Sequence, residues 1–236
     1  MRFDKKVVMI SGASRGIGLA SAEQYLNEGA SISVCARNKE TLKEVFKDID
    51  EDRILITEAD ISKPEDIEIW FDETLKKFGR LDVLLNNAGT LILKPFAEQS
   101  IEDWQQSLNV NVLGTALCCK HAFAAMKDYG GGSIVNISSL AGIRGLEKFP
   151  GTSSYAASKA AVVSLTEVLA VEGKAFSIRV NCIAPGAVDT QMLREAAPGL
   201  KTNTKPSEIA CTILYLSDPA SSPKITGSTL EVFSNE

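Results

Sequence analysis

The fold is decided by residues 7–18, which read VVMISGASRGIG. The short apolar run Val7–Ser11 predicts a buried strand, and the pattern that begins at Gly16 predicts a helix. A glycine turn between a strand and a helix lets backbone N–H groups at the positive end of the helix approach a phosphate. The spacing G-x-x-x-G-x-G differs from the G-x-G-x-x-G dinucleotide motif. A turn that only needs glycine torsions therefore remains an alternative at this point.

Short apolar runs alternate with longer amphipathic ones along the rest of the chain, a pattern typical of β-strand and α-helix units around a parallel sheet. The predicted strands are Val7–Ser11, Ser31–Ala36, Ile54–Glu58, Val83–Asn86, 133–137, 178–183 and Thr229–Val232, and the predicted helices cover 16–28, 39–49, 64–78, 101–128, 154–172 and 206–217. Residues 141–153 and 190–204 are expected to be loops beside a site, the second a short lid. We expect one doubly wound α/β Rossmann domain over residues 1–236, with a seven-stranded parallel sheet and helices on both faces.

Composition excludes several classes of protein. The 236 residues are 44% hydrophobic, enough for one sizeable core, and the net charge of -5 without a basic block argues against nucleic-acid binding. His121 is the only histidine, so multi-histidine metal sites are impossible and no metal is expected. The five cysteines lie in apolar stretches without a Cys-x-x-Cys pair, so we expect reduced, buried thiols as in a cytosolic protein. Neither a secretory signal nor a segment of membrane-spanning length is recognised, so no membrane association is predicted.

Tyr155 and Lys159 are four residues apart at the start of a predicted helix, so both side chains lie on one face, a turn apart. Phenolate at neutral pH requires about 4 kcal/mol of stabilisation, and an ammonium group roughly 5 Å away supplies about 3 kcal/mol. The pair is therefore expected to lower the tyrosine pKa. On its own, the same spacing also suits an ordinary amphipathic helix.

The second predicted strand ends in Cys35-Ala36-Arg37-Asn38, without the acidic residue that accepts hydrogen bonds from an adenosine 2'-hydroxyl. Arg37 follows instead, and Arg15 lies inside the glycine turn. Two guanidinium groups suit a 2'-phosphate, which favours NADP(H) over NAD(H). An ordinary solvated arginine is the alternative for Arg37.

The ordered set of motifs resembles the short-chain dehydrogenase/reductase family from Val7 to about Leu230. The set consists of the glycine turn, Asn86-Asn87-Ala88-Gly89, Asn111, Ser139, Tyr155 with Lys159, and Pro185-Gly186. Within the family, the chain looks most similar to 3-oxoacyl-(acyl carrier protein) reductases in its length and in Gly-Ala-Ser-Arg-Gly-Ile-Gly.

The resemblance implies roles for four catalytic residues. Tyr155 would protonate a carbonyl oxygen during reduction, and Ser139 would hydrogen-bond the same oxygen. Lys159 would lower the tyrosine pKa and bind the nicotinamide ribose. Asn111, preferred over the nearby Asn109, would support a water connected to Lys159.

The resemblance also implies a set of cofactor-binding residues. They would contact the pyrophosphate, the 2'-phosphate, the adenine, the two riboses and the nicotinamide carboxamide. The residues are Gly12, Ser14, Arg15, Gly16, Ile17, Gly18, Arg37, Asp60, Ile61, Asn87, Ala88, Gly89, Tyr155, Lys159, Pro185, Gly186, Val188 and Thr190.

Three departures from the family pattern stand out. Ser11 replaces the usual threonine, the stretch between Ser139 and Tyr155 is longer than is common, and the C-terminus lacks Asp-Gly-Gly. The second departure lies in the expected wall of the substrate pocket, and the third lies where the resemblance implies subunit packing.

The sequence thus predicts an NADP(H)-dependent oxidoreductase acting on a carbonyl/alcohol pair, free or linked to an acyl carrier, in the direction of reduction. It is expected to be cytoplasmic and, by the resemblance, a homotetramer or homodimer. Met192, Leu193 and Leu200 suggest an apolar lid. Two alternatives stay open: an NAD(H)-dependent alcohol or sugar dehydrogenase, and a non-catalytic NADPH sensor or interaction protein.

Overall fold

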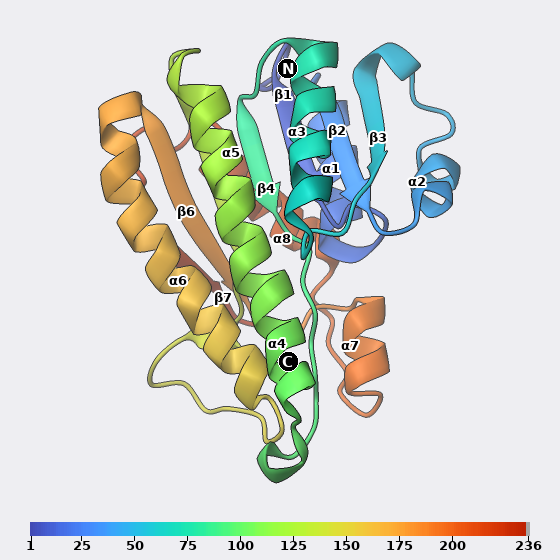
Figure 1. The fold of residues 1–236 in the computed structure, drawn as a ribbon, viewed down its shortest axis with the longest axis vertical. Coiled ribbons are helices and arrows are strands. Elements are labelled where there is room, and N and C mark those ends of the chain that lie inside the picture. Colours follow the sequence, from blue (N-terminus) through green and yellow to red (C-terminus); the bar gives the residue numbers. More distant parts are fainter. Residues whose placement is uncertain (235–236) are drawn as a thin grey trace.

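The strand β1 (Val7–Ser11) lies inside a seven-stranded sheet, between β2 and β4, in the computed structural model, which describes residues 1–234. The sheet order is β3-β2-β1-β4-β5-β6-β7, and every pair is parallel (Figure 1). The other strands are β2 (Ser31–Ala36), β3 (Ile54–Glu58), β4 (Val83–Asn86), β5 (Gly132–Ile137), β6 (Ile178–Pro185) and β7 (Thr229–Val232). The predicted parallel sheet is confirmed.

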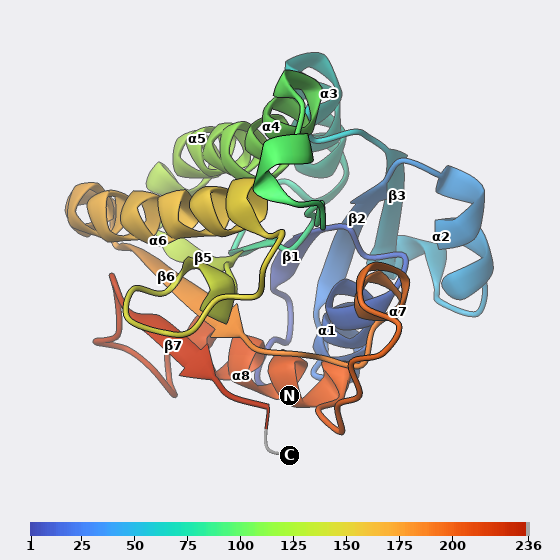
Figure 2. The ribbon, with the colours of Figure 1, turned by 90° about the horizontal axis from the view of Figure 1, so that it is seen from below.

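Helices cover both faces of the sheet (Figure 2). One face carries α1 (Gly16–Asn27) and α8 (Pro206–Ser217), and the other carries α3 (Pro64–Phe78), α4 (Ile101–Leu108), α5 (Thr115–Lys127) and α6 (Ser153–Gly173). Two short helices, α2 (Lys39–Val45) and α7 (Gln191–Ala196), lie at the periphery, and 3-10 turns occupy Glu51–Arg53, Phe96–Glu98, Leu140–Gly142 and Lys174–Phe176. Covered on both faces, the central strands are apolar at nearly every position rather than at alternate ones.

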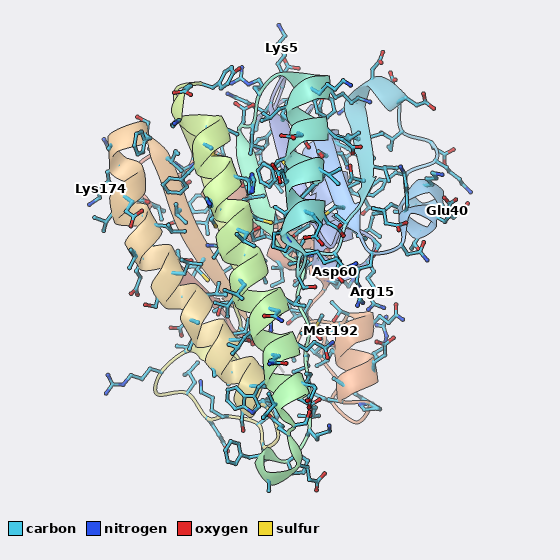
Figure 3. The ribbon with its side chains drawn as sticks, viewed as in Figure 1. Lys5, Arg15, Glu40, Asp60, Lys174 and Met192 are labelled. Atoms are coloured by element: carbon cyan, nitrogen blue, oxygen red, sulfur yellow. The ribbon has the colours of Figure 1, made fainter. Side chains whose placement is uncertain are left out.

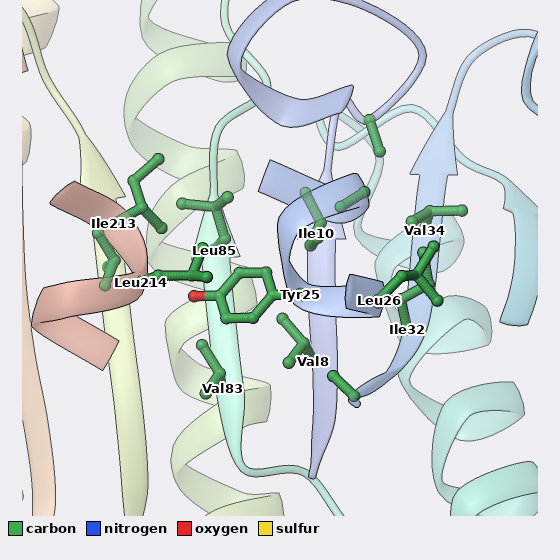
Figure 4. Close-up of a cluster of buried hydrophobic side chains, with 14 of the residues drawn as sticks. Val8, Ile10, Tyr25, Leu26, Ile32, Val34, Val83, Leu85, Ile213 and Leu214 are labelled. Carbon is green, nitrogen blue, oxygen red and sulfur yellow. The ribbon is translucent and has the colours of Figure 1, made fainter. Parts of the chain in front are cut away.

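The core between the sheet and α1 centres on Tyr25, whose ring is surrounded by aliphatic side chains from strands and from α8 (Figure 4). Val8 and Ile10 of β1 point to this face, whereas Met9 between them packs against Trp70 and Phe71 on the other. The buried Tyr25 hydroxyl hydrogen-bonds Ser217, which satisfies its one polar group.

The predicted helix 101–128 is interrupted. A π-helical turn, η3 (Asn109–Gly114), separates α4 from α5. At its end, a Cβ built on Gly114 would lie 2.5 Å from the Ile61 carbonyl oxygen, so only glycine allows this close approach. The helical periodicity of residues 101–128 does not reveal this π-helical turn, because its contacts are with residues distant in the sequence.

Both stretches predicted as loops contain helical turns, so these two predictions are wrong in detail. Residues 190–204 hold α7, which starts with the Thr190 side chain accepting a hydrogen bond from the Leu193 N–H, 3.3 Å away. Residues 141–153 overlap the 3-10 turn that begins at Leu140.

Two expectations drawn from composition also need correction. The α6 helix and the 3-10 turn after it form a continuous helix, Ser153–Phe176, which by length and composition alone could cross a membrane. The core helix of a water-soluble protein passes the same test, and α6 packs along β6, so this is weak support for a span. Cys211 is exposed, whereas Cys35, Cys118, Cys119 and Cys182 are buried free thiols as expected.

Candidate active site

The candidate site lies at the carboxyl ends of the strands, beside the point where the order reverses between β1 and β4. Chains from β1 and β4 leave the sheet there on opposite faces, which opens the crevice that binds ligands in doubly wound folds. The glycine turn follows β1, the Asn87–Gly89 segment follows β4, and Ser139 follows β5. Figure 3 shows Arg15, Asp60 and Met192 gathered at this end of the molecule.

The glycine turn is packed directly against the segment after β4. Gly12 has φ +67°, and a Cβ on it would lie 2.9 Å from Ala88 Cα, so neither the torsion nor the space admits a side chain. The Asn87 side chain donates to the carbonyls of Ser11 and Gly12, both at 3.0 Å. The Ser11 hydroxyl accepts from the N–H groups of Asn87 and Ala88, both at 3.1 Å. Serine at position 11, in place of the usual threonine, thus retains the hydroxyl that hydrogen-bonds the glycine turn to the segment after β4.

The start of α1 fits the pyrophosphate of a dinucleotide. Its N-cap, Arg15, makes no side-chain capping bond, and the first turn holds no acidic residue. N–H groups at this terminus therefore remain available to an anion, and no carboxylate competes with it. Ser14, Gly16, Ile17 and Gly18 belong to the same turn.

Tyr155 and Ser139 meet from different elements. Tyr155 lies in the first turn of α6 and is partly exposed, while Ser139 caps the 3-10 turn after β5 and accepts a hydrogen bond from the Ala141 N–H at 3.2 Å. Burial raises the pKa of Tyr155, and a hydrogen bond with the Ser139 side chain opposes that rise only in part. The phenol is therefore protonated at neutral pH, next to a serine hydroxyl.

Lys159 lies one turn further along α6 and is 5% exposed. Its Nζ donates to the Ile137 carbonyl at 2.8 Å and lies 5.8 Å from the centre of the Tyr155 ring. Burial lowers the pKa of Lys159 to about 8. An ammonium group carries three donors, so further donors are available to hydroxyls of a bound ribose.

The structure differs here from the expected lowering of the tyrosine pKa. Lys159 is directed to the Ile137 carbonyl rather than to the phenol, and loss of water around Tyr155 dominates its pKa. The two side chains share a face of α6 as predicted, but burial dominates the pKa of Tyr155.

Asn111 is buried in the π-helical turn η3, and its amide group is fully engaged. It donates to the Thr90 carbonyl and to the Ser158 hydroxyl, both at 2.9 Å, and accepts from the Thr90 N–H at 2.8 Å. A Cβ on Gly89 would lie 3.2 Å from Asn111 Oδ1 and 3.4 Å from Lys159 Nζ, so these groups are neighbours. Asn111 thus connects the segment after β4 with α6, which makes it a positioning residue.

The adenosine end of the crevice holds Arg37, Asp60 and Ile61. Arg37 is exposed, and Asp60 accepts from the Ser62 N–H at 2.9 Å and hydroxyl at 2.8 Å. Burial acts to raise the pKa of Asp60, but the Ser62 hydrogen bonds and the charges of Arg37 and Lys63 leave it below its usual value. Asp60 therefore caps the chain after β3 while lying within range of Arg37.

One acidic residue in this region was not considered in the sequence analysis. Glu58 ends β3 and pairs in register with Ala36, next to Arg37. Its carboxylate lies 3.4 Å from the Lys39 N–H. The only available signal was its place at the end of the neighbouring strand, which depends on the sheet register.

The segment after β6 forms the remaining wall. Gly186 donates to the Val232 carbonyl at 2.8 Å, Val188 is buried, and the Thr190 methyl lies beside Gly16, 3.2 Å from where its Cβ would be. Pro185 ends β6. The predicted nicotinamide wall therefore touches the glycine turn.

The lid carries two ion pairs that sequence reasoning missed. Glu195 of α7 lies 3.8 Å from Arg15, with both side chains about half exposed, and Arg194 pairs with Asp189. Arg15 and Glu195 are far apart in the sequence. Arg194 and Asp189 meet through the start of α7, a helix that was not predicted. The lid is thus connected to a residue expected to bind the 2'-phosphate.

No group of three or more His, Cys, Asp or Glu side chains within residues 1–234 is placed to hold a metal ion.

Comparisons with known proteins identify the relatives of the chain. Residues 6–201 match the family model described as short chain dehydrogenase. The 3-oxoacyl-[acyl-carrier-protein] reductase of Chlamydia muridarum is 32% identical over 96% of this chain and 95% of its own. L-fucose dehydrogenase of Oryctolagus cuniculus is 35% identical over 83% of this chain and 67% of its own. Among solved structures, 3-ketoacyl-(acyl-carrier-protein) reductase from Brucella melitensis complexed with NADH superposes with a TM-score of 0.89, 31% identity, and coverage of 98% of both chains.

Proposed function

The chain belongs to the short-chain dehydrogenase family, whose members are oxidoreductases of carbonyl or alcohol groups, and we propose that it is an NADP(H)-dependent ketone reductase. The family fold binds a nicotinamide cofactor, and the substrate is a small molecule. One observation carries the choice of direction. Relatives that cover nearly the whole chain are named as reductases, and Tyr155 in contact with Ser139 can donate a proton to a carbonyl oxygen, as reduction requires.

The reduction divides between the cofactor and the chain. When bound, the reduced nicotinamide supplies the hydride that adds to the carbonyl carbon. Ser139 and Tyr155 hydrogen-bond the carbonyl oxygen, which polarises the carbonyl group. As negative charge develops on that oxygen, the phenol proton of Tyr155 moves to it, so the carbonyl becomes an alcohol and Tyr155 is left as phenolate.

Lys159 acts on the phenolate that this proton transfer leaves on Tyr155. Its ammonium group, already buried near the Tyr155 ring, stabilises the phenolate that forms and so eases proton release. The remaining N–H donors of its ammonium group bind the nicotinamide ribose. Asn111 holds α6 against the segment after β4 through hydrogen bonds to Ser158 and Thr90. The roles of the four residues follow the family pattern.

The cofactor is held along the crevice from the glycine turn to Thr190. Arg15 and Arg37 bind the 2'-phosphate, Asp60 and Ile61 edge the adenine, Asn87–Gly89 lie beside the adenosine ribose, and the residues after β6 hold the carboxamide. Support comes from the uncapped start of α1 and from the absence of an acidic residue at positions 35–38.

The substrate class is of the 3-oxoacyl type or another ketone with apolar substituents. Two relatives carry 3-oxoacyl or 3-ketoacyl reductase names over nearly their full length. Met192, Leu193 and Leu200 are partly buried in and after α7, where apolar side chains can cover an acyl chain. We further propose that the protein is cytoplasmic and forms a homotetramer or homodimer, the assemblies that the family resemblance implies.

A second candidate is an NAD(H)-dependent alcohol or sugar dehydrogenase. Glu58 favours it, because a carboxylate beside Ala36 is near enough to the ribose site to repel a 2'-phosphate. One relative is a fucose dehydrogenase, and the solved relative from Brucella melitensis was complexed with NADH.

The test is a panel of ketones, aldehydes, alcohols and sugars assayed with both phosphorylated and unphosphorylated cofactors. Tyr155→Phe should lower turnover by about 10²- to 10⁴-fold with little change in cofactor affinity. Tyr215→Phe, an exposed tyrosine of α8, is the matched control. Equal turnover of Tyr155→Phe and wild type would remove the acid assignment. A higher kcat/KM with NADH than with NADPH would select the second candidate, and cofactor binding without turnover of any compound would favour a sensor.

A further inference from the structure

A second cavity lies at the amino ends of the strands, opposite to the end of the sheet that holds Tyr155. It encloses about 630 Å³, within the range of small-molecule sites. Its walls come from the chain before β1, the glycines that lead into β5, the start of β6 and the chain after α8. In Figure 3, Lys174 lies toward this end, away from Arg15 and Met192. The six residues of β5 separate the cavity from Ile137, a distance of roughly 15 to 20 Å.

The cavity wall is strongly cationic although the whole chain carries -5. A single acidic residue, Asp82, contributes to it, together with the six cations Arg2, Lys6, Arg80, Lys174, Arg179 and Lys224. Asp82 pairs with Lys6 at 3.0 Å and Arg80 at 2.6 Å.

Two further carboxylates reduce this charge. Glu28 pairs with Arg2 at 2.7 Å, and Asp218 acts on Arg2 and Arg179 through space. When all three carboxylates are counted against the six cations, three positive charges remain around one cavity.

Arg179 is the most confined of these cations. Its guanidinium donates to the carbonyls of Leu216 at 2.7 Å and Ser217 at 2.9 Å, and no carboxylate within residues 1–234 forms an ion pair with it. Burial lowers its pKa. Carbonyl dipoles hold the partly buried group in place, and Asp218 acts on its charge only through space, without an ion pair.

Lys174 and Lys224 face the cavity from two other elements. Both are exposed, and no ion pair involves either of them in the part of the chain that the structure describes. Lys174 begins the 3-10 turn Lys174–Phe176, and the carbonyl of Ser177, which follows this turn, accepts from the Gly132 N–H at 3.3 Å. The loop before β5 is thereby fixed against the loop before β6, so this wall is formed before any ligand arrives.

We propose that this cavity binds a small anion that carries two or more phosphate groups, at a site separate from the cofactor. Three unbalanced charges on converging walls call for a compact multivalent anion. Guanidinium and ammonium donors match phosphate oxygens in geometry and charge.

The experiment is a calorimetric titration of the full chain with inorganic pyrophosphate at constant ionic strength. The protein is first saturated with its nicotinamide cofactor, because the glycine turn would otherwise attract the same probe. Cofactor saturation is measured beforehand in a separate titration, so failure to bind cofactor is distinguished from failure of this proposal. Lys174→Gln combined with Lys224→Gln removes two exposed cations, and Lys43→Gln combined with Lys47→Gln removes two exposed cations from the region of α2.

We expect one pyrophosphate per chain, bound at least about tenfold more weakly by the Lys174/Lys224 double variant and equally well by the Lys43/Lys47 control. Absence of binding to wild type would overturn the proposal. So would equal affinity in the two double variants, or equal heat from sodium chloride at the same ionic strength.

Discussion

Replacing Lys159 by methionine is expected to stabilise the protein at neutral pH while removing its activity. Methionine has a similar length and volume and no charge to bury. The ammonium group of Lys159 is 5% exposed, and no carboxylate forms an ion pair with it in residues 1–234. Its one hydrogen-bond acceptor is the Ile137 carbonyl.

The size of the effect follows from the pKa. Burial lowers the pKa of Lys159 from 10.5 to about 8, so the folded state disfavours the charged form by about 3 kcal/mol. The substitution also leaves the Ile137 carbonyl without its donor, which costs about 1 to 2 kcal/mol. The net gain in the free energy of unfolding at pH 7 is therefore about 1 to 2 kcal/mol.

The dependence on pH has a definite sign. Between pH 8 and 10.5 the unfolded chain keeps the Lys159 proton and the folded protein releases it, so the unfolded state binds more protons. Wild-type stability therefore gains about 3 kcal/mol from this group as pH rises through that window, and the variant lacks the gain. The advantage of the variant should shrink above pH 8 and reverse by about pH 10.5.

Urea unfolding at several pH values, with wild type and variant side by side, measures this difference, and the other titrating groups cancel. Lys120→Met replaces an exposed lysine of α5 and should leave the pH curve parallel to wild type. If Lys159→Met were less stable than wild type at pH 7 and its curve ran parallel, the burial argument would be refuted.

Three other predictions concern the crevice. The difference in ultraviolet absorbance between wild type and Tyr155→Phe should show one phenol that ionises above pH 10, because burial raises its pKa, and ionisation near neutrality would contradict this. Arg37→Gln should weaken NADPH binding about tenfold and leave NADH binding unchanged in fluorescence titrations, since only the 2'-phosphate loses a partner; an equal loss with both cofactors would count against the assignment. Glu195→Gln frees Arg15 and should strengthen NADPH binding by no more than about threefold, because the ion pair is exposed, and weaker binding would show that the lid needs this contact.

The sheet could be predicted from the sequence because its central strands are buried on both faces and read as continuous apolar runs between turn signals. Val7–Ser11 and Val83–Asn86 are matched residue for residue. The family motifs likewise located Ser139, Tyr155 and Lys159 without reference to their contacts, and the structure brings these side chains to one end of the sheet.

The features that could not be predicted depend on contacts between distant residues. Within the π-helical turn, the Asn111 amide bonds Thr90, twenty-one residues earlier, and Ser158, forty-seven residues later. The raised pKa of Tyr155 also follows from burial, which a four-residue spacing does not reveal. The assignment of Arg37 was incomplete for the same reason, since Glu58 becomes its neighbour only through the register of β3.

The positions of Tyr155 and Lys159 are set by the register of α6, whereas Ser139 is set by the end of β5. The residues between them form a surface excursion in which Lys148 bonds the carbonyls of Leu140 and Ile143. We therefore expect insertions or deletions in this excursion, which the family resemblance implies is a wall of the substrate pocket, to leave the reacting groups in their places. For protein engineering, this segment is the part of the chain in which libraries of altered length should yield new substrate ranges with the chemistry retained.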